Sequence, residues 1–294
     1  MPTIRELMIG VRARLAAAGI PVEEAALDAE VLARHVLGWS RADLLAREAE
    51  APPPAFAAAY DRLAARRERR EPVAYIRGTQ EFWGREFLVS PAVLIPRPET
   101  ELIVEAAMDF LGAPLAPGAP DGTDVLRVVD IGTGSGCLAI TLALEYPALH
   151  VVATDISAEA LDVARANAAR HGVADRVTFL HAPYFGGVLA PVDLVVSNPP
   201  YVADDEPLPP EVGGHEPPAA LYGGADGLRD VREILAQAAG RLAPSGRLLV
   251  EIGYGQADAV RRAVAHAEGL ALVRFINDLQ GIPRVADVSR QPAA

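Results

Sequence analysis

The sequence contains no lysine: all 27 of its basic residues are arginine. Without lysine the chain cannot form the Schiff base that pyridoxal enzymes require, and it has no Walker A loop for a nucleoside triphosphate. Cysteine occurs once, at Cys137, which excludes an internal disulfide and favours a reducing, cytoplasmic location. We interpret Cys137 as a small core residue and not as a catalytic thiol.

Long apolar runs and metal-ligand patterns are also missing from the 294 residues. No stretch reaches the roughly 20 apolar residues that cross a bilayer, and the acids among the first 30 residues are untypical of a signal peptide. The six histidines do not fall at metal-ligand spacings, so we expect no metal. The net charge of −12 opposes binding to a phosphate backbone. We therefore expect no direct contact with a membrane or with nucleic acid. The oligomeric state is open at this point, with a monomer as the default expectation.

The one cluster of basic residues is Arg66-Arg67-Glu68-Arg69-Arg70. Arginine near the C-terminus of a helix suits the helix dipole, so we predict that this cluster is a solvated helix end. The alternative is a docking patch for an acidic or RNA-bound partner.

The pattern of apolar and turn residues divides the chain into three parts. Residues 1–70 predict a small helical bundle that begins at the capping box Thr3 to Glu6. Residues 71–97 predict a linker with a hairpin that turns near Trp83-Gly84. Residues 98–294 alternate strands with helices after a Pro- and Gly-rich loop at 112–124, as an open α/β sheet requires. We expect the bundle to be a scaffold or a surface that docks the substrate.

The most distinctive stretch is Asn198-Pro199-Pro200-Tyr201, which follows the apolar strand predicted over 192–197. Each proline restricts the backbone, so the stretch should form a stiff elbow at the carboxyl end of a strand, where open α/β sheets bind ligands. It offers a side-chain amide, a free carbonyl and an aromatic ring, which together suit a planar –NH2 group. An Asn-Pro pair alone is more often only a turn signal.

A glycine turn, Gly132-Thr133-Gly134-Ser135-Gly136, follows another predicted strand. Such turns bring the backbone close to a ligand in front of a helix N-terminus. The spacing differs from that of a pyrophosphate fingerprint, because Cys137 stands where the last glycine would be. Asp155 ends the next strand, where a carboxylate can bind both hydroxyls of a ribose.

Taken together, Asp130 to Gly136, Asp155 and the elbow resemble the class I S-adenosylmethionine-dependent methyltransferases. The resemblance becomes specific through several further blocks in the same order, and it then extends to the bacterial release factor glutamine methyltransferases. These blocks are Glu71-Pro72-x3-Ile76-x-Gly78, Phe82-x-Gly84, Leu94 to Glu101, Glu216-Pro217-x2-Ala220-Leu221, Asp226-Gly227-Leu228 and Asp278-Leu279-x-Gly281-x2-Arg284.

The resemblance implies a Rossmann-like, seven-stranded methyltransferase fold behind a helical N-terminal domain. It also implies transfer of a methyl group from S-adenosylmethionine to the side-chain amide of the Gly-Gly-Gln glutamine in peptide chain release factors. We expect Asn198, Pro199 and Tyr201 to act in catalysis, and Pro200 and Glu216 to join them in binding the substrate. The expected cofactor-binding residues are Gly132, Thr133, Gly134, Ser135, Gly136, Asp155, Tyr184 and Asn198.

Two positions depart from the family pattern. Pro183 stands where members commonly carry an aspartate that contacts adenine, which leaves Tyr184 to cover the ring. Pro218 stands where an arginine often follows Glu216-Pro217. Three alternatives stay open: an adenine N6 methyltransferase acting on DNA, a non-catalytic S-adenosylmethionine-binding interaction protein, and a nicotinamide dehydrogenase.

Overall fold

The computed structural model describes residues 2–112 and 126–291. The chain divides into two compact units, Met1–Thr79 with Leu208–His215, and Gln80–Pro207 with Glu216–Ala294. The segment Leu208–His215 therefore packs with the N-terminal helices, although the sequence analysis places it within the domain of residues 98–294. The loop predicted over 112–124 lies outside the described residues, except for Gly112.

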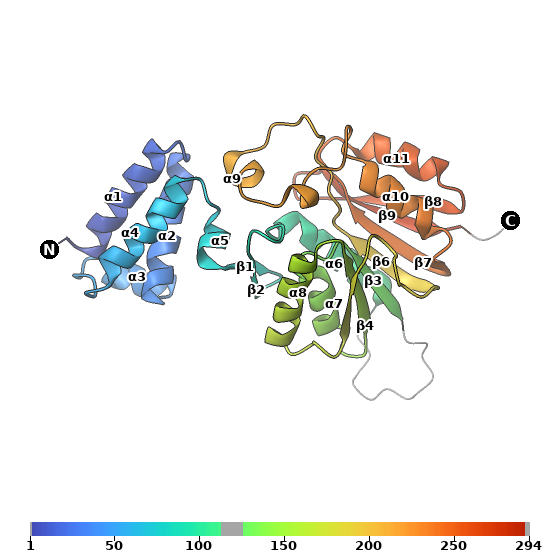
Figure 1. Cartoon of the computed structure of the whole chain (residues 1–294), viewed down its shortest axis with the longest axis horizontal. Coiled ribbons are helices and arrows are strands. Elements are labelled where there is room, and N and C mark those ends of the chain that lie inside the picture. Colours follow the sequence, from blue (N-terminus) through green and yellow to red (C-terminus); the bar gives the residue numbers. More distant parts are fainter. Residues whose placement is uncertain (1, 113–125, 292–294) are drawn as a thin grey trace. The chain divides into compact units, whose positions relative to one another are not determined.

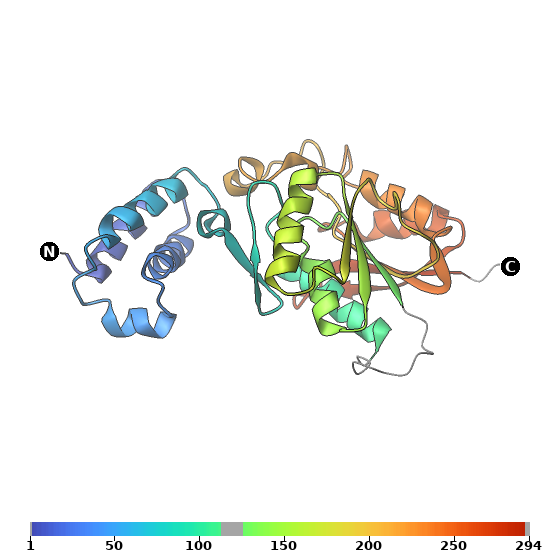
Figure 2. The same cartoon turned by 60° about the horizontal axis from the view of Figure 1, so that its bottom comes forward.

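The N-terminal unit is a helical bundle with its own apolar core (Figure 2). Its first helix begins with the predicted capping box: Glu6 N–H donates to the Thr3 hydroxyl, and Thr3 N–H donates to the Glu6 carboxylate. The buried Tyr60 hydroxyl donates to the carbonyl of Ala29 over 2.8 Å, which ties two helices together. The helices are α1 (Ile4–Ala17), α2 (Val22–Leu37), α3 (Arg41–Arg47), α4 (Phe56–Glu68), α5 (Val73–Arg77) and, from the later segment, α9 (Pro210–Gly213).

The prediction that the basic cluster is a solvated helix end is wrong for Arg67. Its side chain is only 2% exposed and lies among three acids of the same unit: Glu24 at 2.7 Å, Asp28 at 2.7 Å and Glu211 at 2.9 Å. A buried guanidinium is tolerated because carboxylates neutralise it and satisfy its N–H groups. The sequence could not show this pairing, because these acids come from α2 and α9, far from Arg67 in the chain.

The second unit is built on a seven-stranded sheet in the order β5-β4-β3-β6-β7-β9-β8 (Figure 1). Strands β3 to β7 are parallel and β9 runs antiparallel to both of its neighbours. The strands are β3 (Arg127–Ile131), β4 (His150–Asp155), β5 (Val177–His181), β6 (Val192–Ser197), β7 (Leu242–Glu251), β8 (Leu270–Asn277) and β9 (Pro283–Arg290). The predicted hairpin is confirmed as β1 (Thr79–Phe82) and β2 (Arg85–Leu88).

Helices cover both faces of this sheet (Figure 1). Successive residues of the central strands enter different cores: Val128 packs in one and Val129 in the other. The central strands are therefore apolar on both faces, as expected for parallel strands. One face carries α6 (Glu101–Leu111), α7 (Cys137–Glu145) and α8 (Ala158–Arg170), and the other carries α10 (Arg229–Ala238) and α11 (Ala257–His266).

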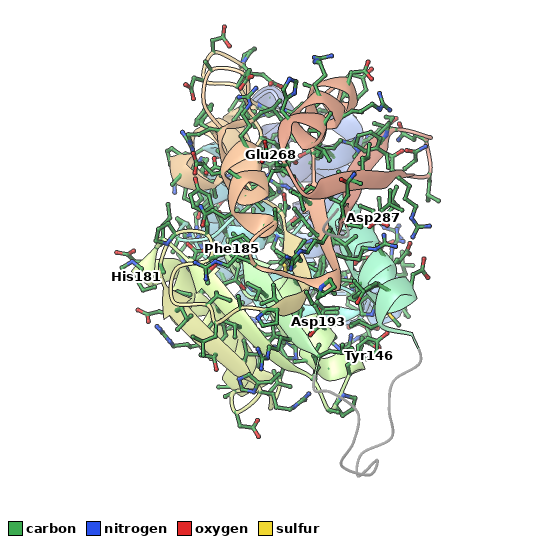
Figure 3. All side chains as sticks on the ribbon, turned by 90° about the vertical axis from the view of Figure 1, so that its right-hand side faces the viewer. Tyr146, His181, Phe185, Asp193, Glu268 and Asp287 are labelled. Atoms are coloured by element: carbon green, nitrogen blue, oxygen red, sulfur yellow. The ribbon has the colours of Figure 1, made fainter. Side chains whose placement is uncertain are left out.

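The sequence analysis misses α5, α9 and α11. Helix α11 has a simple amphipathic pattern, since Val260 and Val264 are buried four residues apart. One strand of the sheet also carries a buried acid: Asp287 of β9, labelled in Figure 3, is 3% exposed. Its carboxylate binds Arg247 at 2.5 Å and Arg274 at 3.3 Å. Among the described residues, no helix combines the length and the apolar character needed to span a bilayer.

Candidate active site

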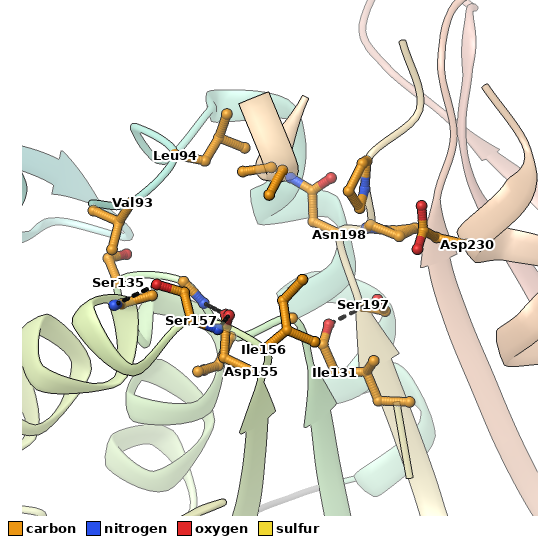
Figure 4. Close-up of a pocket in the computed structure, with 18 of the residues that line it drawn as sticks. Val93, Leu94, Ile131, Ser135, Asp155, Ile156, Ser157, Ser197, Asn198 and Asp230 are labelled. Atoms are coloured by element: carbon orange, nitrogen blue, oxygen red, sulfur yellow. Dashed lines mark hydrogen bonds between the residues drawn. The ribbon is translucent and has the colours of Figure 1, made fainter. Parts of the chain in front are cut away.

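A cavity of about 300 Å³ opens at the carboxyl ends of the parallel strands. This is the edge at which open α/β sheets bind their ligands. Figure 4 shows Asp155 and Asn198, from the ends of β4 and β6, on opposite sides of the opening. The predicted site residues that line the cavity are Gly132, Thr133, Gly134, Ser135, Asp155, Tyr184, Asn198, Pro199 and Pro200.

The glycine turn joins β3 to α7. Gly134 has φ +55°, a left-handed conformation that a residue with a Cβ rarely adopts. Gly136 also has positive φ, but it is not among the lining residues; a Cβ there would come within 2.8 Å of Ile140 and 3.2 Å of Ala164. Gly136 thus allows α7 and α8 to pack closely, and its predicted role in holding the cofactor stays a prediction.

Asp155 is held by the turn that it faces. Its carboxylate accepts the backbone N–H of Gly134 over 2.9 Å and that of Ser157 over 2.9 Å (Figure 4). Burial raises the pKa of this carboxyl above its ordinary value, and the backbone hydrogen bonds oppose the shift. A carboxylate oriented in this way can still accept further donors, because each oxygen has two lone pairs.

A second acid, Asp130, lies beneath the turn at the end of β3. It accepts the Thr133 hydroxyl over 2.6 Å and the Ala139 N–H over 3.2 Å, while its Oδ1 is buried and has no partner among the described residues. Burial raises the pKa of Asp130 to about 7. The sequence analysis names Asp130 only as part of the strand and the motif. Its contacts show that it supports the turn from below.

The elbow follows β6 as predicted, and Asn198 is held by its side chain. Asn198 Nδ2 donates to the Thr100 hydroxyl over 3.0 Å. Asn198 Oδ1 is buried and accepts no hydrogen bond within residues 2–112 and 126–291. A buried acceptor without a partner is rare, and this one belongs to a residue that lines the cavity.

Two predicted substrate residues do not line the cavity. Tyr201 is the last residue of the elbow. Its carbonyl accepts a hydrogen bond from Gln256 Nε2 over 2.8 Å, and burial raises the pKa of its hydroxyl. Glu216 is 3% exposed and its carboxylate binds the Arg97 guanidinium and the Ile95 N–H. Direct contact of either residue with a substrate therefore stays a prediction.

Comparison with known proteins gives two matching family models: the PrmC N-terminal domain over residues 6–78 and the methyltransferase small domain over residues 119–208. A release factor glutamine methyltransferase from Cereibacter sphaeroides is 46% identical over 283 residues, which is 96% of each chain. One from Bradyrhizobium diazoefficiens is 42% identical and covers 92% of this chain and 90% of its own. The chain belongs to the release factor glutamine methyltransferase family. The predictions of family, enzyme class and S-adenosylmethionine as cofactor are thereby confirmed.

Solved structures share the fold of this methyltransferase at low identity. The hMettl16 catalytic domain, crystallised with an RNA hairpin, has a TM-score of 0.53 at 15% identity and covers 79% of this chain and 92% of its own. A methyltransferase from Pyrococcus furiosus has a TM-score of 0.51 at 18% identity and covers 72% and 91%. The prediction of a Rossmann-like seven-stranded methyltransferase fold is confirmed.

The position where family members commonly carry aspartate, Pro183, lines the cavity next to Tyr184. The Tyr184 hydroxyl donates to Asp230 of α10 over 2.8 Å, and burial raises the pKa of Tyr184 to about 12. Asp230 also lines the cavity and binds Arg229 at 2.9 Å. The methyltransferase therefore has a carboxylate where Pro183 and Tyr184 line the cavity. It comes from Asp230 of α10 and not from the segment after β5.

Sequence reasoning misses three polar residues around the site: Asp230, Thr100 and Glu251. The sequence could have predicted Glu251, because it ends strand β7 at the same edge of the sheet as Asp130, Asp155 and Asn198. Thr100 lies in the block Leu94 to Glu101, which the sequence analysis names only as part of the family resemblance. Cys137 lines the cavity as well, but burial raises the pKa of its thiol to about 12, which leaves it protonated and unreactive.

Proposed function

We propose that this methyltransferase transfers a methyl group from S-adenosylmethionine to the side-chain amide nitrogen of the Gly-Gly-Gln glutamine of peptide chain release factors, with Asn198 and Pro199 holding the amide. The observation that carries the proposal is the buried Asn198 Oδ1, which lacks a donor and belongs to a residue lining the cavity. The names of full-length relatives support the substrate class.

The residues around the cavity suit the cofactor. Asp155 would accept the ribose hydroxyls, and Gly134 and Ser135 would admit the amino-acid end against the N-terminus of α7, where backbone N–H groups favour a carboxylate. Tyr184 and Ile156 offer apolar surface for the adenine ring. The cofactor supplies an electrophilic methyl group on a sulfonium.

An amide nitrogen is a poor nucleophile, because its lone pair is delocalised into the carbonyl. Asn198 Oδ1 and the Pro199 carbonyl would each accept one N–H of the glutamine amide, which fixes the direction of the nitrogen. Both oxygens also stabilise the positive charge that develops on nitrogen, and positioning alone can supply roughly 7–11 kcal/mol. Tyr201 would pack against the amide plane. The methyl group would pass from sulfur to nitrogen, the electron pair of the broken S–CH3 bond would stay on sulfur as a neutral thioether, and the nitrogen would lose one N–H proton to water.

A Gly-Gly-Gln loop suits this opening because its glycines have no side chains. We propose that the helical bundle docks the rest of the release factor, and that the enzyme works as a cytoplasmic monomer without contacting nucleic acid. The negative net charge of −12 supports the last point, since protein–DNA affinity depends on neutralising phosphates.

A labelling assay tests the proposal. Wild-type enzyme with methyl-labelled S-adenosylmethionine is given either a folded release factor or duplex DNA, at low salt so that DNA binding is favoured. We expect label in the release factor alone, and none when its motif glutamine is changed to alanine. Label in DNA would favour an adenine N6 methyltransferase, and label in the Gln→Ala factor would show that another residue is the acceptor. No label in either acceptor would favour a non-catalytic binding protein.

A further inference from the structure

A chain of hydrogen bonds leads from the elbow into the interior of the methyltransferase unit. Asn198 Nδ2 donates to Thr100 Oγ1 over 3.0 Å, and Thr100 Oγ1 donates to Glu251 Oε2 over 2.7 Å. Thr100 and Glu251 are each 2% exposed. Three residues from three separate parts of the chain, the start of α6, the end of β6 and the end of β7, thus form one buried network.

The direction of every hydrogen bond in this network follows from its last member. An ionised carboxylate can only accept hydrogen bonds, so Glu251 takes the single hydroxyl proton of Thr100. Thr100 Oγ1 is then left with lone pairs only, and it must accept from Asn198. The amide of Asn198 can satisfy this only by turning its –NH2 group toward Thr100, which leaves Oδ1 for another donor.

We infer that Thr100 and Glu251 are positioning residues that orient the Asn198 amide, so that its oxygen and not its nitrogen is presented to the amide of the substrate. The inference rests on the proposed function, in which Asn198 Oδ1 accepts an N–H of the glutamine. In the opposite orientation the –NH2 group of Asn198 would face the –NH2 group of the substrate glutamine, and two donors cannot bond to each other. The glutamine nitrogen would then have no acceptor from Asn198 in the transition state.

The orientation depends on the charge of Glu251. Burial raises the pKa of this carboxyl to about 7, the hydrogen bond from Thr100 lowers it, and the nearby Glu99 raises it. Two other groups act on it: the Tyr201 hydroxyl and the Arg284 guanidinium both lower the pKa. The charge of Glu251 also raises the pKa of the Cys137 thiol, which stays neutral.

When Glu251 is protonated, it can donate to Thr100, and Thr100 can then donate to Asn198. The Asn198 amide would turn over and present its –NH2 group to the substrate. We therefore expect kcat to fall as the pH drops through about 7, the value to which burial raises the pKa of Glu251. A residue that only fills space would not impose this pH dependence.

The first experiment compares Thr100→Val, Thr100→Ser and the control Thr141→Val in single-turnover methylation of a release factor. Valine has the shape of threonine without the hydroxyl, whereas serine keeps the hydroxyl. Thr141 is a suitable control because it is fully buried in α7, does not line the cavity, and its hydroxyl has no partner among the described residues.

We expect Thr100→Val to lower the methylation rate by about 10- to 100-fold, a loss typical of removing an orienting partner. Its affinity for S-adenosylmethionine, measured by calorimetry, and its KM for the release factor should change by less than about threefold, because the lost interaction acts in the transition state. Thr100→Ser should recover most of the rate, and Thr141→Val should match wild type.

The second experiment records the pH profile of kcat for wild type and Glu251→Gln, and it does not depend on whether Thr100→Val folds. Glutamine cannot titrate, so the decrease near pH 7 should disappear and the rate at pH 8 should be lower than that of wild type. An unchanged rate in both Thr100→Val and Glu251→Gln would overturn the inference, as would a Glu251→Gln profile equal to that of wild type. A wild-type enzyme that fails to label the release factor would instead overturn the proposed function.

Discussion

Gly134 donates its backbone N–H to Asp155 over 2.9 Å, and so joins the glycine turn after β3 to the end of β4. Ser157 N–H binds the other oxygen of the same carboxylate over 2.9 Å. The carboxylate is therefore oriented by backbone groups alone, and these do not change when neighbouring side chains do. Its position at the rim of the cavity is set before any ligand arrives.

Replacing Asp155 by asparagine should weaken S-adenosylmethionine binding at least about tenfold, because hydrogen bonds to a charged group contribute roughly 1.5–3 kcal/mol each. The new –NH2 group would also face the N–H of Gly134 or of Ser157. Isothermal titration calorimetry measures the change, with Asp162→Asn on the exposed surface of α8 as the control. Equal affinity in wild type and Asp155→Asn would remove Asp155 from the cofactor site.

Replacing Asn198 by alanine should lower kcat by about 10²–10³, the usual effect of losing one group that stabilises the transition state. Affinity for S-adenosylmethionine should stay nearly the same, because Asp155 and the glycine turn are untouched. Steady-state labelling of a release factor gives kcat, and Asn277→Ala at the exposed end of β8 is the control. If turnover hardly changes, the glutamine amide must be held by other residues.

Most of the fold could be predicted from local patterns. The runs that became β3 and β6 are buried on both faces over most of their length, so apolar residues follow one another in them without alternation. Turn chemistry located the β1–β2 hairpin at Trp83-Gly84. The packing of Leu208–His215 with the N-terminal helices could not be predicted, because it depends on Glu211 pairing with Arg67 and Arg70. Such pairs leave no local trace in a sequence.

The site could be predicted where one side chain has one evident role. Asp155 and Asn198 each end a strand, and the structure brings both to one cavity. Thr100 and Glu251 were missed because their contribution is a hydrogen bond to a distant residue: Thr100 binds Asn198 at a separation of 98 positions and Glu251 at a separation of 151. Glu216 is the opposite case: the motif predicts that it binds the substrate, but its carboxylate binds Arg97 and the backbone N–H of Ile95.

The two buried acids Asp130 and Glu251 should make stability fall as the pH rises. Burial raises both pKa values to about 7, from ordinary values of 3.8 and 4.5. An acid that holds its proton more tightly in the folded state favours folding fully below its unfolded pKa, and this contribution is lost as the pH rises through the folded pKa. For Glu251 the free energy of unfolding should therefore fall between about pH 4.5 and pH 7, by about 3 kcal/mol.

Urea unfolding at pH 5 and pH 8 measures this change in wild type and in Glu251→Gln. The variant cannot titrate at this position, so its free energy of unfolding should fall less between the two pH values, although the share of Asp130 remains. Equal pH dependence in the two proteins would show that Glu251 is already ionised at pH 5 in the folded chain.

Glu216 is predicted to bind the substrate, but its side chain is buried outside the lining of the cavity, so stability and KM must be measured together. Its carboxylate is buried, pairs with the Arg97 guanidinium and accepts the Ile95 N–H over 3.0 Å. The segment that follows it contributes Pro217, Ala219 and Ala220 to the wall of the cavity. Glu216→Ala should therefore destabilise the protein by about 3 kcal/mol, because removing one partner of a buried pair leaves the other uncompensated.

Urea unfolding at pH 8 measures this loss, with Asp258→Ala as the control: Asp258 pairs with Arg261 at a side-chain exposure of 78%, and such pairs contribute about 0–1 kcal/mol. Glu216→Gln separates shape from charge, since glutamine fills the same space and still accepts the Ile95 N–H. A folded Glu216→Gln enzyme of near-normal stability whose KM for the release factor rises sharply would show that Glu216 contacts the substrate directly. Lower stability with an unchanged KM would show that it acts by holding the wall of the cavity in place.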